Sequence, residues 1–423
     1  MTNRQNAQSS QRSRRNFWRY WTGQTISNLG SSITLFALPL LVYKISGSAL
    51  NLGISSAANM LPYLLFGLLL GAWTDRIDRK RMMILMDIGR AAVIATIPLL
   101  AFLGQLSVWW IYGVGFLHST LTICFEAGEF AAIPSLVAQD DLVSANGRIQ
   151  ASYSAASILG PVLAGILVAF VPLASLLLLD ASSFLLSAFS IALVTSSFNT
   201  KSDEPRRHIL RDVAEGLRYV WGHPVLRNIS LMMALVNFVA ATHSAQLVLF
   251  ARERLQASDS QVGFLYTAGS VGVVTLALLA GPLRRRWSFS KVALGALLLD
   301  GLFILALAFT RLYWLALIFE ALAQGCGILF NINTGSLRQA IVPNHLLGRV
   351  VSIASVIAWS AIPLGAFLGG LIISETNNVA LVYAGIGVLV MLIPLCFAFT
   401  PLGHAERYLV AKEDAAKIPS GSL

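Results

Sequence analysis

The stretch Gly71-Ala-Trp-Thr-Asp-Arg-Ile-Asp-Arg-Lys-Arg81 (GAWTDRIDRKR) places a dense charge cluster between two apolar runs. Six of the seven residues from Asp75 to Arg81 are charged, with both signs present, whereas LPYLLFGLLL before them and MMILM after them carry no charge. Apolar runs need lipid and charges need water, so this pattern is typical of a short loop between two membrane-crossing helices.

The composition of the whole chain also indicates a membrane protein. Hydrophobic residues make up 56% of its 423 residues and charged residues only 12%, against about 25% charge in soluble proteins. A helix needs roughly 20 apolar residues to cross a bilayer, so the length allows about a dozen crossings. Because the apolar runs are continuous and do not alternate with polar residues, the expected fold is an all-α membrane protein and not a barrel.

Twelve apolar segments are expected, in two groups of six around a polar linker. They begin near Tyr20, Leu50, Met82, Val108, Ala151, Ala174, Ile229, Val262, Val292, Leu312, Val350 and Val379. The expected organisation is a tail at 1–18, a six-helix bundle at 19–198, a linker at 199–227, a second six-helix bundle at 228–402 and a tail at 403–423. Apolar residues recur at helical spacing in the linker, which predicts an amphipathic helix on the membrane surface or on loop ends.

The distribution of basic residues predicts the orientation. If the N-terminus is cytoplasmic, 25 of the 30 Lys and Arg residues fall on the cytoplasmic side, as the positive-inside rule requires. We therefore expect a multi-pass cell-membrane protein with both termini in the cytoplasm and no cleaved signal peptide. The basic charge is expected to contact anionic lipids, so no nucleic-acid partner is needed to explain it. A monomer is expected.

The two halves of the chain resemble each other weakly. Several features recur in the same direction at offsets of 201 to 213 residues, namely Gly147-Arg148 with Gly348-Arg349, Pro161 with Pro363, Gly71 with Gly281, and Asp87 with Asp300. Two parallel six-helix repeats around a central cavity are a transporter architecture, in which one half rocks against the other to give alternating access.

On these features the chain resembles twelve-helix transporters of the major facilitator superfamily. GAWTDRIDRKR is similar to the superfamily's signature between the second and third helices, which implies a gating role for Gly71, Asp75, Arg76, Asp78, Arg79 and Lys80. Asp78 replaces the usual second Gly, as in the branch that contains enterobactin exporters and macrolide efflux proteins. GQTISNLGSSITLFALPLLVY, IPSLVAQDDLVSAN, LLLDASSF, EGLRYVWGHPVLRN and VPNHLLGRVVS resemble the same branch.

The stretch ILGPVLAGIL resembles the Gly-Pro signature of antiporters. Gly160, Pro161 and Gly165 match it, while Ala164 stands where a second Gly is common. The resemblance implies efflux in exchange for protons. Gly and Pro also allow close helix approach and a bend, so a packing kink without coupling is an equally supported interpretation.

Charged residues inside membrane helices are costly, which makes each of them a functional candidate. Asp87 and Arg90 are three residues apart, share a helix face and can pair. This spacing favours a structural or gating ion pair over contact with substrate.

Glu126 and Glu129 are also three residues apart. Two like charges on one face favour a proton on one of them, which would suit a proton site. Alternatively, the two carboxylates bind basic residues such as Arg76 or Arg148, an arrangement that we favour slightly.

Three carboxylates lie deeper in the apolar segments: Asp180, Asp300 and Glu320. A carboxylate in a low-dielectric cavity favours its proton and can release it when the cavity opens to water. Glu320 is the leading candidate for coupling to a proton or a cationic substrate, whereas Asp180 is more readily explained by a helix cap or an interhelical bond. His118 and His243 could titrate, but satisfied buried histidines are more common.

Topology does not explain the acidic residues of the opening stretch. We expect Asp75 to contact a helix end in the opposite half, near Arg349 or at the positive end of the helix dipole. Such a contact would hold the outward-facing state and break on inward opening.

No cofactor, metal site or catalytic residue is expected. The three Cys lie in apolar runs without paired spacing, the six His are scattered, and no GxxxxGK[ST] stretch for ATP binding occurs. An enzyme is therefore disfavoured, and a non-transporting sensor would need neither the internal repeat nor the intramembrane acids. The favoured function is export of an amphipathic small molecule, such as a drug, a macrolide-like compound or a siderophore, by proton antiport. Nutrient import and lysolipid transport stay open.

Overall fold

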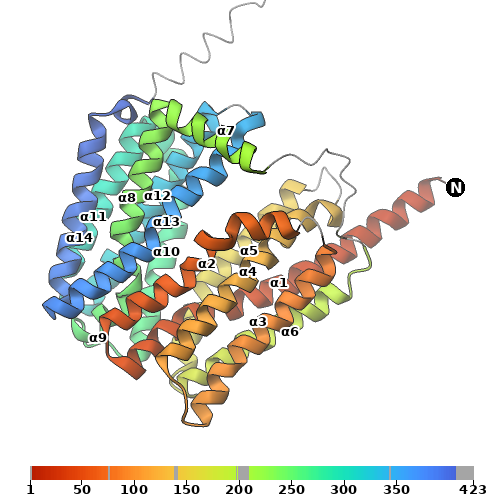
Figure 1. The fold of residues 1–423 in the computed structure, drawn as a ribbon, viewed down its shortest axis with the longest axis horizontal. Helices are drawn as coiled ribbons and strands as arrows, with labels where there is room; N and C mark the ends of the chain where they lie inside the picture. Colours follow the sequence, from red (N-terminus) through yellow and green to blue (C-terminus); the bar gives the residue numbers. More distant parts are fainter. Residues whose placement is uncertain are drawn as a thin grey trace, which may run out of the picture. The chain divides into compact units, whose positions relative to one another are not determined.

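A computed structural model describes residues 2–74, 77–137, 142–196, 198, 209–342 and 344–405. The regular elements within these ranges are helices, and twelve of them are long and apolar enough to cross a membrane. Their positions agree with the apolar segments read from the sequence, so the expected all-α membrane fold is confirmed (Figure 1).

The helices divide into two compact units. The N-terminal unit comprises Met1–Pro205 and Ala257–Thr267, and the C-terminal unit comprises Arg206–Gln256 and Ala268–Leu423. The short stretch 257–267 therefore groups with the first half of the chain although it follows the linker in sequence.

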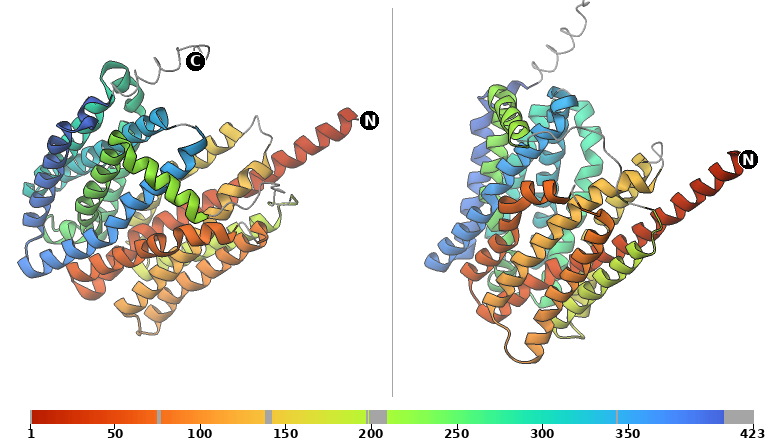
Figure 2. Two further views of the ribbon diagram at one scale, coloured as in Figure 1. Left: turned by 45° about the horizontal axis from the view of Figure 1, so that its top comes forward. Right: turned by 45° about the vertical axis from the view of Figure 1, so that its right-hand side comes forward.

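The N-terminal unit is built from six long helices that run side by side (Figure 2). Within it, α3 packs between α4 and α6, α1 packs on α5 and α6, and α2 packs on α4. The helices are α1 (Thr2–Ser46), α2 (Ala49–Thr74), α3 (Arg79–Phe102), α4 (Val108–Leu136), α5 (Leu142–Leu167) and α6 (Leu177–Ala192), with the short 3-10 helix η2 (Leu173–Leu176) before α6. Since α1 begins at Thr2, the residues of the expected tail continue the first membrane helix.

The C-terminal unit repeats this packing order. Here α11 packs between α12 and α14, and α13 packs on α8, as α3 does between α4 and α6 and α5 does on α1. The helices are α7 (Ile209–Gly222), α8 (Pro224–Ala245), α9 (Leu247–Glu253), α10 (Asp259–Arg286), α11 (Phe289–Phe309), α12 (Tyr313–Ile341), α13 (Asn344–Thr376) and α14 (Val379–Ala398), followed by η3 (Pro401–His404). Of α10, only the part from Ala268 onward belongs to this unit, because its first turns group with the N-terminal unit.

The helix expected in the polar linker is α7, which packs on α8 and α13. It lies across one end of the long helices of its unit (Figure 1). Val220 is fully buried, whereas Leu217 and Trp221 on the same helix are about half exposed at 44% and 50%. The helix therefore presents apolar side chains both to the protein and away from it, as an interfacial helix does.

Large apolar side chains also cover the outside of both units. Phe102, Leu278 and Trp314 are more than three quarters exposed, which would be unfavourable in water but matches contact with lipid. Each unit has its own apolar interior, with Tyr20, Met83 and Phe198 in the N-terminal unit and a larger cluster around α8, α11 and α12 in the C-terminal unit.

Candidate functional site

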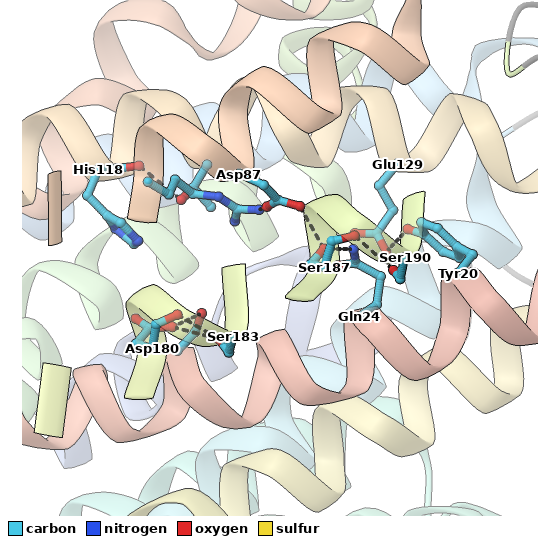
Figure 3. Close-up of polar contacts among 12 residues, drawn as sticks. Tyr20, Gln24, Asp87, His118, Glu129, Asp180, Ser183, Ser187 and Ser190 are labelled. Atoms are coloured by element: carbon cyan, nitrogen blue, oxygen red, sulfur yellow. Dashed lines mark hydrogen bonds and ion pairs between the residues drawn. The ribbon is translucent and has the colours of Figure 1, made fainter. Parts of the chain in front are cut away.

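A buried ion pair lies inside the N-terminal unit. Asp87 and Arg90 of α3 form a salt bridge, with side chains 0% and 6% exposed, so the pairing expected from their spacing is present. Ser187 on α6 donates a hydrogen bond to Asp87 Oδ2 at 2.6 Å, and Gln24 on α1 donates to Ser187 Oγ at 2.7 Å. This chain of polar contacts ties three helices together (Figure 3).

Arg90 is also held by two aromatic rings. Its guanidinium carbon lies 4.1 Å from the ring centre of Phe125 and 4.4 Å from that of Phe184. Each desolvated cation–π contact of this kind contributes on the order of 1–2 kcal/mol. A side chain fixed by a carboxylate and two rings has little freedom to follow a substrate, which supports a structural role for this pair.

The carboxylate of Glu129 is bound by tyrosines. Tyr20 donates to Oε1 at 2.6 Å and Tyr153 donates to Oε2 at 3.1 Å, while the residue is 7% exposed. The two phenols come from α1 and α5, so Glu129 on α4 joins three helices. Sequence spacing alone did not identify these partners, which lie 109 and 24 residues away.

Glu126, three residues earlier, is exposed and lies 3.4 Å from the hydroxyl of Tyr63 on α2. The expected bond from these carboxylates to Arg148 is wrong, because the guanidinium of Arg148 stacks over the Trp18 ring at 4.9 Å. Tyrosine hydroxyls supply the donors that a basic residue was expected to provide. The other expected partner, Arg76, lies outside the described residues.

Asp180 on α6 is fully buried and surrounded by hydroxyls. Thr34 donates to Oδ2 at 2.5 Å, and Ser31 donates to Oδ1 at 3.3 Å. Ser183, one turn further along α6, donates to the backbone oxygen of Asp180 at 2.7 Å, and its hydroxyl oxygen lies 3.4 Å from Oδ1. The interhelical bond that the sequence favoured for Asp180 is thus present between α6 and α1.

A second buried acid–base pair lies in the C-terminal unit. Glu320 Oε2 on α12 is 3.0 Å from His243 Nε2 on α8, with side chains 1% and 5% exposed. Gln324, one turn after Glu320, donates to the other carboxylate oxygen at 3.0 Å. The sequence identified both residues as candidates but did not pair them, because they are 77 positions apart and no spacing rule joins them.

Aromatic side chains position His243. The hydroxyl of Tyr383 on α14 donates to the backbone oxygen of His243 at 2.8 Å, and the two rings meet edge to face at 5.3 Å. Phe250 stacks on Tyr383 at 4.5 Å. Asp300 on α11 is 7% exposed and interacts electrostatically with His243 and Glu320. The three titratable groups therefore share one region where α8, α11 and α12 contribute side chains.

Within the described ranges, no three His, Cys, Asp or Glu side chains are arranged to hold a metal ion.

Part of the charged loop quoted at the outset falls outside the described residues. This applies to Asp75 and Arg76, and also to the side chain of Arg349, so the expected latch lies beyond what the structure describes. Gly71 lies in the last turns of α2.

Asp78, the residue that replaces the usual glycine of the loop signature, caps a helix. Its side chain accepts a hydrogen bond from the backbone N–H of Arg81 at 3.0 Å, at the start of α3. An Asp at this position is among the most favourable N-caps and contributes about 1 kcal/mol to helix stability. The presence of Asp78 in place of the signature glycine thus has a local structural reason, the capping of α3.

Two basic residues of the loop, Arg79 and Lys80, bind backbone oxygens at the C-terminal end of α6 and in the segment after it. Lys80 donates to the backbone oxygens of Ala192 at 3.1 Å and Val194 at 2.6 Å, and Arg79 donates to that of Phe198 at 3.4 Å. Carbonyl groups at a helix C-terminus lack partners within the helix and attract cations. These residues therefore also hold the end of α6 against α3, in addition to any effect on topology.

The Gly-Pro stretch of α5 is a close helix contact. A methyl group added at Gly160 would lie 2.3 Å from Ser32 Cβ on α1, and one added at Gly165 would lie 3.2 Å from Ser260 O, in the first turn of α10. In the C-terminal unit, a methyl group at Gly365 on α13 would lie 1.9 Å from Phe238 O on α8. Equivalent helix pairs in both units thus need a glycine, which supports a packing role for this stretch.

Twelve spans in two units of the same packing order, with charges buried inside both, define a membrane transporter of the major facilitator type. The chain belongs to the transmembrane secretion effector family, whose model matches residues 10–416. It is a multi-pass membrane protein and a transporter, not an enzyme.

Two characterised relatives are efflux proteins. The multidrug efflux pump Tap of Mycolicibacterium fortuitum is 27% identical over 362 residues, covering 81% of this chain and 85% of that protein. Macrolide efflux protein A of Streptococcus pyogenes is 24% identical over 364 residues, covering 84% and 88%. The resemblance to macrolide efflux proteins that the sequence motifs indicated is confirmed.

Solved structures share the fold. A bacterial homologue of the human lysosomal transporter Spinster, in an inward-facing conformation, superposes with a TM-score of 0.73 at 15% identity, covering 95% of this chain and 98% of that one. A bacterial homologue of the iron transporter ferroportin gives a TM-score of 0.72 at 18% identity, covering 91% and 99%.

Proposed function

We propose that the protein exports amphipathic small molecules from the cell in exchange for protons, and that the buried pair of Glu320 and His243 couples the two movements. The observation that carries this proposal is the 3.0 Å contact between Glu320 Oε2 and His243 Nε2 inside the C-terminal unit. An acid and a base that lie together out of water within a transporter are suited to bind and release a proton.

The charge of the pair explains how it would couple. With an ionised Glu320 and a neutral His243 the pair carries one negative charge, and one bound proton makes it neutral overall. A neutral pair is stable in a closed, low-dielectric site, whereas an open site hydrates the carboxylate and lets the proton leave. A cationic group of a substrate could replace the proton at the same carboxylate. Asp300 interacts electrostatically with both residues, and in its ionised form it would strengthen the binding of either cation.

The substrate class is proposed from the relatives. Tap is named as a multidrug efflux pump and macrolide efflux protein A as a macrolide exporter, which supports export of drugs or macrolide-like compounds by this chain. The Gly160-Pro161 stretch supports antiport by resemblance, although its close contact with α1 is explained by packing alone. Siderophore export, lysolipid transport and nutrient uptake are the alternatives that the experiment below separates.

We also propose a location, an orientation and a gating loop for the transporter. We propose a plasma-membrane monomer with cytoplasmic termini and bundles at 19–198 and 228–402. In this orientation the half-exposed Leu217 and Trp221 of α7 would face anionic lipid on the cytoplasmic side. The loop residues Gly71, Asp75, Arg76, Asp78, Arg79 and Lys80 would then gate the cytoplasmic opening.

The test is drug accumulation in an efflux-deficient bacterial host. Cells expressing the protein should accumulate less of a macrolide antibiotic than control cells, and a protonophore should remove the difference. Glu320→Gln should abolish export, because glutamine keeps the shape of the side chain but can neither ionise nor bind and release a proton. The matched control is Glu375→Gln, which alters an exposed carboxylate at the end of α13.

Two results would overturn the proposal. Export that a protonophore does not affect would exclude proton coupling, and normal export by Glu320→Gln would exclude the assigned pair. If the wild type changes the accumulation of no drug while radiolabelled siderophore or lysolipid is transported, the substrate class is wrong. The amount of each variant in the membrane fraction, measured by immunoblot, shows whether loss of export reflects loss of protein.

A further inference from the structure

We infer that Asp180 is a second proton-binding site, enclosed within the N-terminal unit by the hydroxyls of Ser31, Thr34 and Ser183. This inference deepens the proposed proton coupling. A role of Asp180 in transport rests on that proposed function. It gives the N-terminal unit a proton site of its own, separate from Glu320 in the C-terminal unit.

The site is closed and made of oxygen atoms. Asp180 is 0% exposed, and its two carboxylate oxygens lie 2.5 Å from Thr34 Oγ1 and 3.3 Å from Ser31 Oγ, both on α1. Ser183 Oγ completes the set at 3.4 Å. A methyl group at Gly30 would lie 2.9 Å from Asp180 Oδ1, so the glycine is what allows α1 to approach the carboxyl group.

Hydroxyl partners distinguish Asp180 from an acid that is permanently charged. A hydroxyl can donate or accept a hydrogen bond, so the same contacts satisfy the carboxyl group in both protonation states. When Asp180 is ionised, Thr34 donates to Oδ2 as the structure has it. When a proton binds Oδ2, that oxygen donates to Thr34 Oγ1 and the hydroxyl hydrogen turns away. In this step the Asp180 carboxylate takes up one proton and loses its one negative charge.

Asp87 is the contrasting case in the same unit. Its partner Arg90 has only N–H donors and no acceptor, so protonation of Asp87 would leave a buried guanidinium unpaired. Loss of one partner from a buried ion pair is strongly unfavourable. Asp87 is therefore held ionised, and Arg90, which also interacts electrostatically with Asp180, is already neutralised.

Among the described residues, no Lys, Arg or His side chain pairs with the Asp180 carboxyl group, whose side-chain partners are hydroxyls. The titratable group that α4 brings to this region is His118, whose ring lies 5.6 Å from that of Phe184 on α6. α6 and η2 contain no second charged residue, and α3 brings only the Asp87–Arg90 pair to this depth. On α1 the basic residues nearest to Asp180's partners along the chain are Arg19 and Lys44, which bind Leu193 O and Asp259. Burying a carboxylate without a counter-charge is costly in the membrane interior. Binding a proton removes that cost, because the buried guanidinium of Arg90 is already paired with Asp87.

The test is infrared difference spectroscopy of the purified full-length protein, which detects the C=O stretch of a protonated carboxyl group. Spectra recorded at about pH 5 and about pH 9, without substrate, bracket the ordinary range of a perturbed carboxyl group. The wild type should gain separate bands for Asp180 and Glu320 at the lower pH. Asp180→Asn should remove one band and leave the other, and Glu320→Gln should do the reverse.

Two further variants make the assignment specific. Thr34→Val keeps the side-chain shape but removes the nearest hydroxyl, so it should shift the Asp180 band without removing it. This variant also tests the inference if Asp180→Asn does not fold. The double variant Asp87→Asn/Arg90→Met is the control, because it removes an acid that stays ionised and contributes no such band, without leaving Arg90 unpaired.

The inference would be overturned by any of three results. These are an unchanged set of bands in Asp180→Asn and Thr34→Val, a band that disappears with Glu129→Gln instead, and a band that depends on Na⁺ in place of K⁺. The last result would indicate a sodium site at the same oxygens. Because no substrate is present, the Asp180 band can be found even if drug export fails, and it can be missing even if export by Glu320 succeeds.

Discussion

The ammonium group of Lys80 lies 2.6 Å from the backbone oxygen of Val194, just beyond the end of α6. A lysine that topology alone would place on the cytoplasmic side is thus also bound to a helix terminus of the same unit. Lys80 also binds the backbone oxygen of Ala192, the last residue of α6, and Arg79 binds that of Phe198 in the segment after the helix. These two residues therefore fasten α3 to the C-terminal end of α6 and to the segment that follows it.

We expect Lys80→Met to lower the stability of the protein by about 1 kcal/mol, the magnitude of a cation at a helix C-terminus. The methionine keeps most of the apolar chain and removes only the charge and its hydrogen bonds. Thermal unfolding in detergent measures the effect, which should shrink at high salt because exposed charges are screened. The control is Arg81→Met, since the Arg81 side chain is 86% exposed. Equal losses in both variants would contradict the role of Lys80.

The ion pair of Asp87 and Arg90 should be more sensitive to removal of one partner than to removal of both. Asp87→Asn leaves Arg90 without its charge partner between two rings, which we expect to cost roughly 3–5 kcal/mol. The double variant Asp87→Asn/Arg90→Met leaves no buried charge and should recover part of this loss. The unfolding midpoints of the three proteins test the prediction, and a double variant less stable than Asp87→Asn would contradict it.

Gly160→Ala should destabilise the N-terminal unit by about 1–3 kcal/mol, because the added methyl group overlaps Ser32 and forces α1 and α5 apart. Gly113 lies inside α4 with no neighbouring atom within 4 Å of an added methyl group. Gly113→Ala should therefore be neutral or stabilise by about 0.5–1 kcal/mol. Thermal unfolding of both variants provides the comparison. Similar behaviour of the two glycines would rule out a packing requirement at Gly160.

The start of α8 should weaken in mild acid. Nδ1 of His223 accepts a hydrogen bond from the backbone N–H of Leu226, which requires a neutral ring, and burial lowers the pKa of His223 from its ordinary value of 6.5. The folded state thus favours the neutral form. This contribution is complete above the unfolded pKa and is lost as the pH falls through the lower, folded pKa.

Hydrogen exchange at the Leu226 amide measures this effect between about pH 7.5 and about pH 5. After correction for the intrinsic exchange rate, protection should fall with pH in the wild type. His223→Asn, which keeps a capping acceptor that does not titrate, should show no such fall. The same pH dependence in both proteins would mean that another group is responsible.

The fold was largely predictable because lipid imposes a strong and local signal. Long apolar runs predicted twelve helices and their approximate starts, since every backbone polar group in a bilayer must be satisfied within a helix. The pairing of Asp87 with Arg90 was predictable for the same reason, because three residues on one helix define a shared face.

The candidate site was predictable in its residues but not in its contacts. Glu320 was chosen because a carboxylate is rare in an apolar segment, but its bond to His243 depends on how α8 and α12 pack. The α1 hydroxyls of Ser31 and Thr34 carried no sequence signal as partners of Asp180, because Ser and Thr are common in membrane helices and usually bond to their own backbone. The tyrosines on Glu129 were missed for a similar reason. Which side chains meet across helices is decided by tertiary packing, and helical spacing cannot supply it.

The glycine contacts of α5 with α1 and of α13 with α8 bear on how the two halves diverged. Gly160 and Gly365 hold equivalent helix pairs at close range, although the sequences around them differ and the buried charges differ more. One half holds an Asp–Arg pair and a hydroxyl-bound Asp, whereas the other holds a Glu–His pair beside an Asp. After a duplication, a glycine at such a close helix contact cannot be replaced by a residue with a larger side chain, whereas buried polar residues can be replaced one at a time. The two halves could therefore inherit one scaffold and acquire different ionisable chemistry.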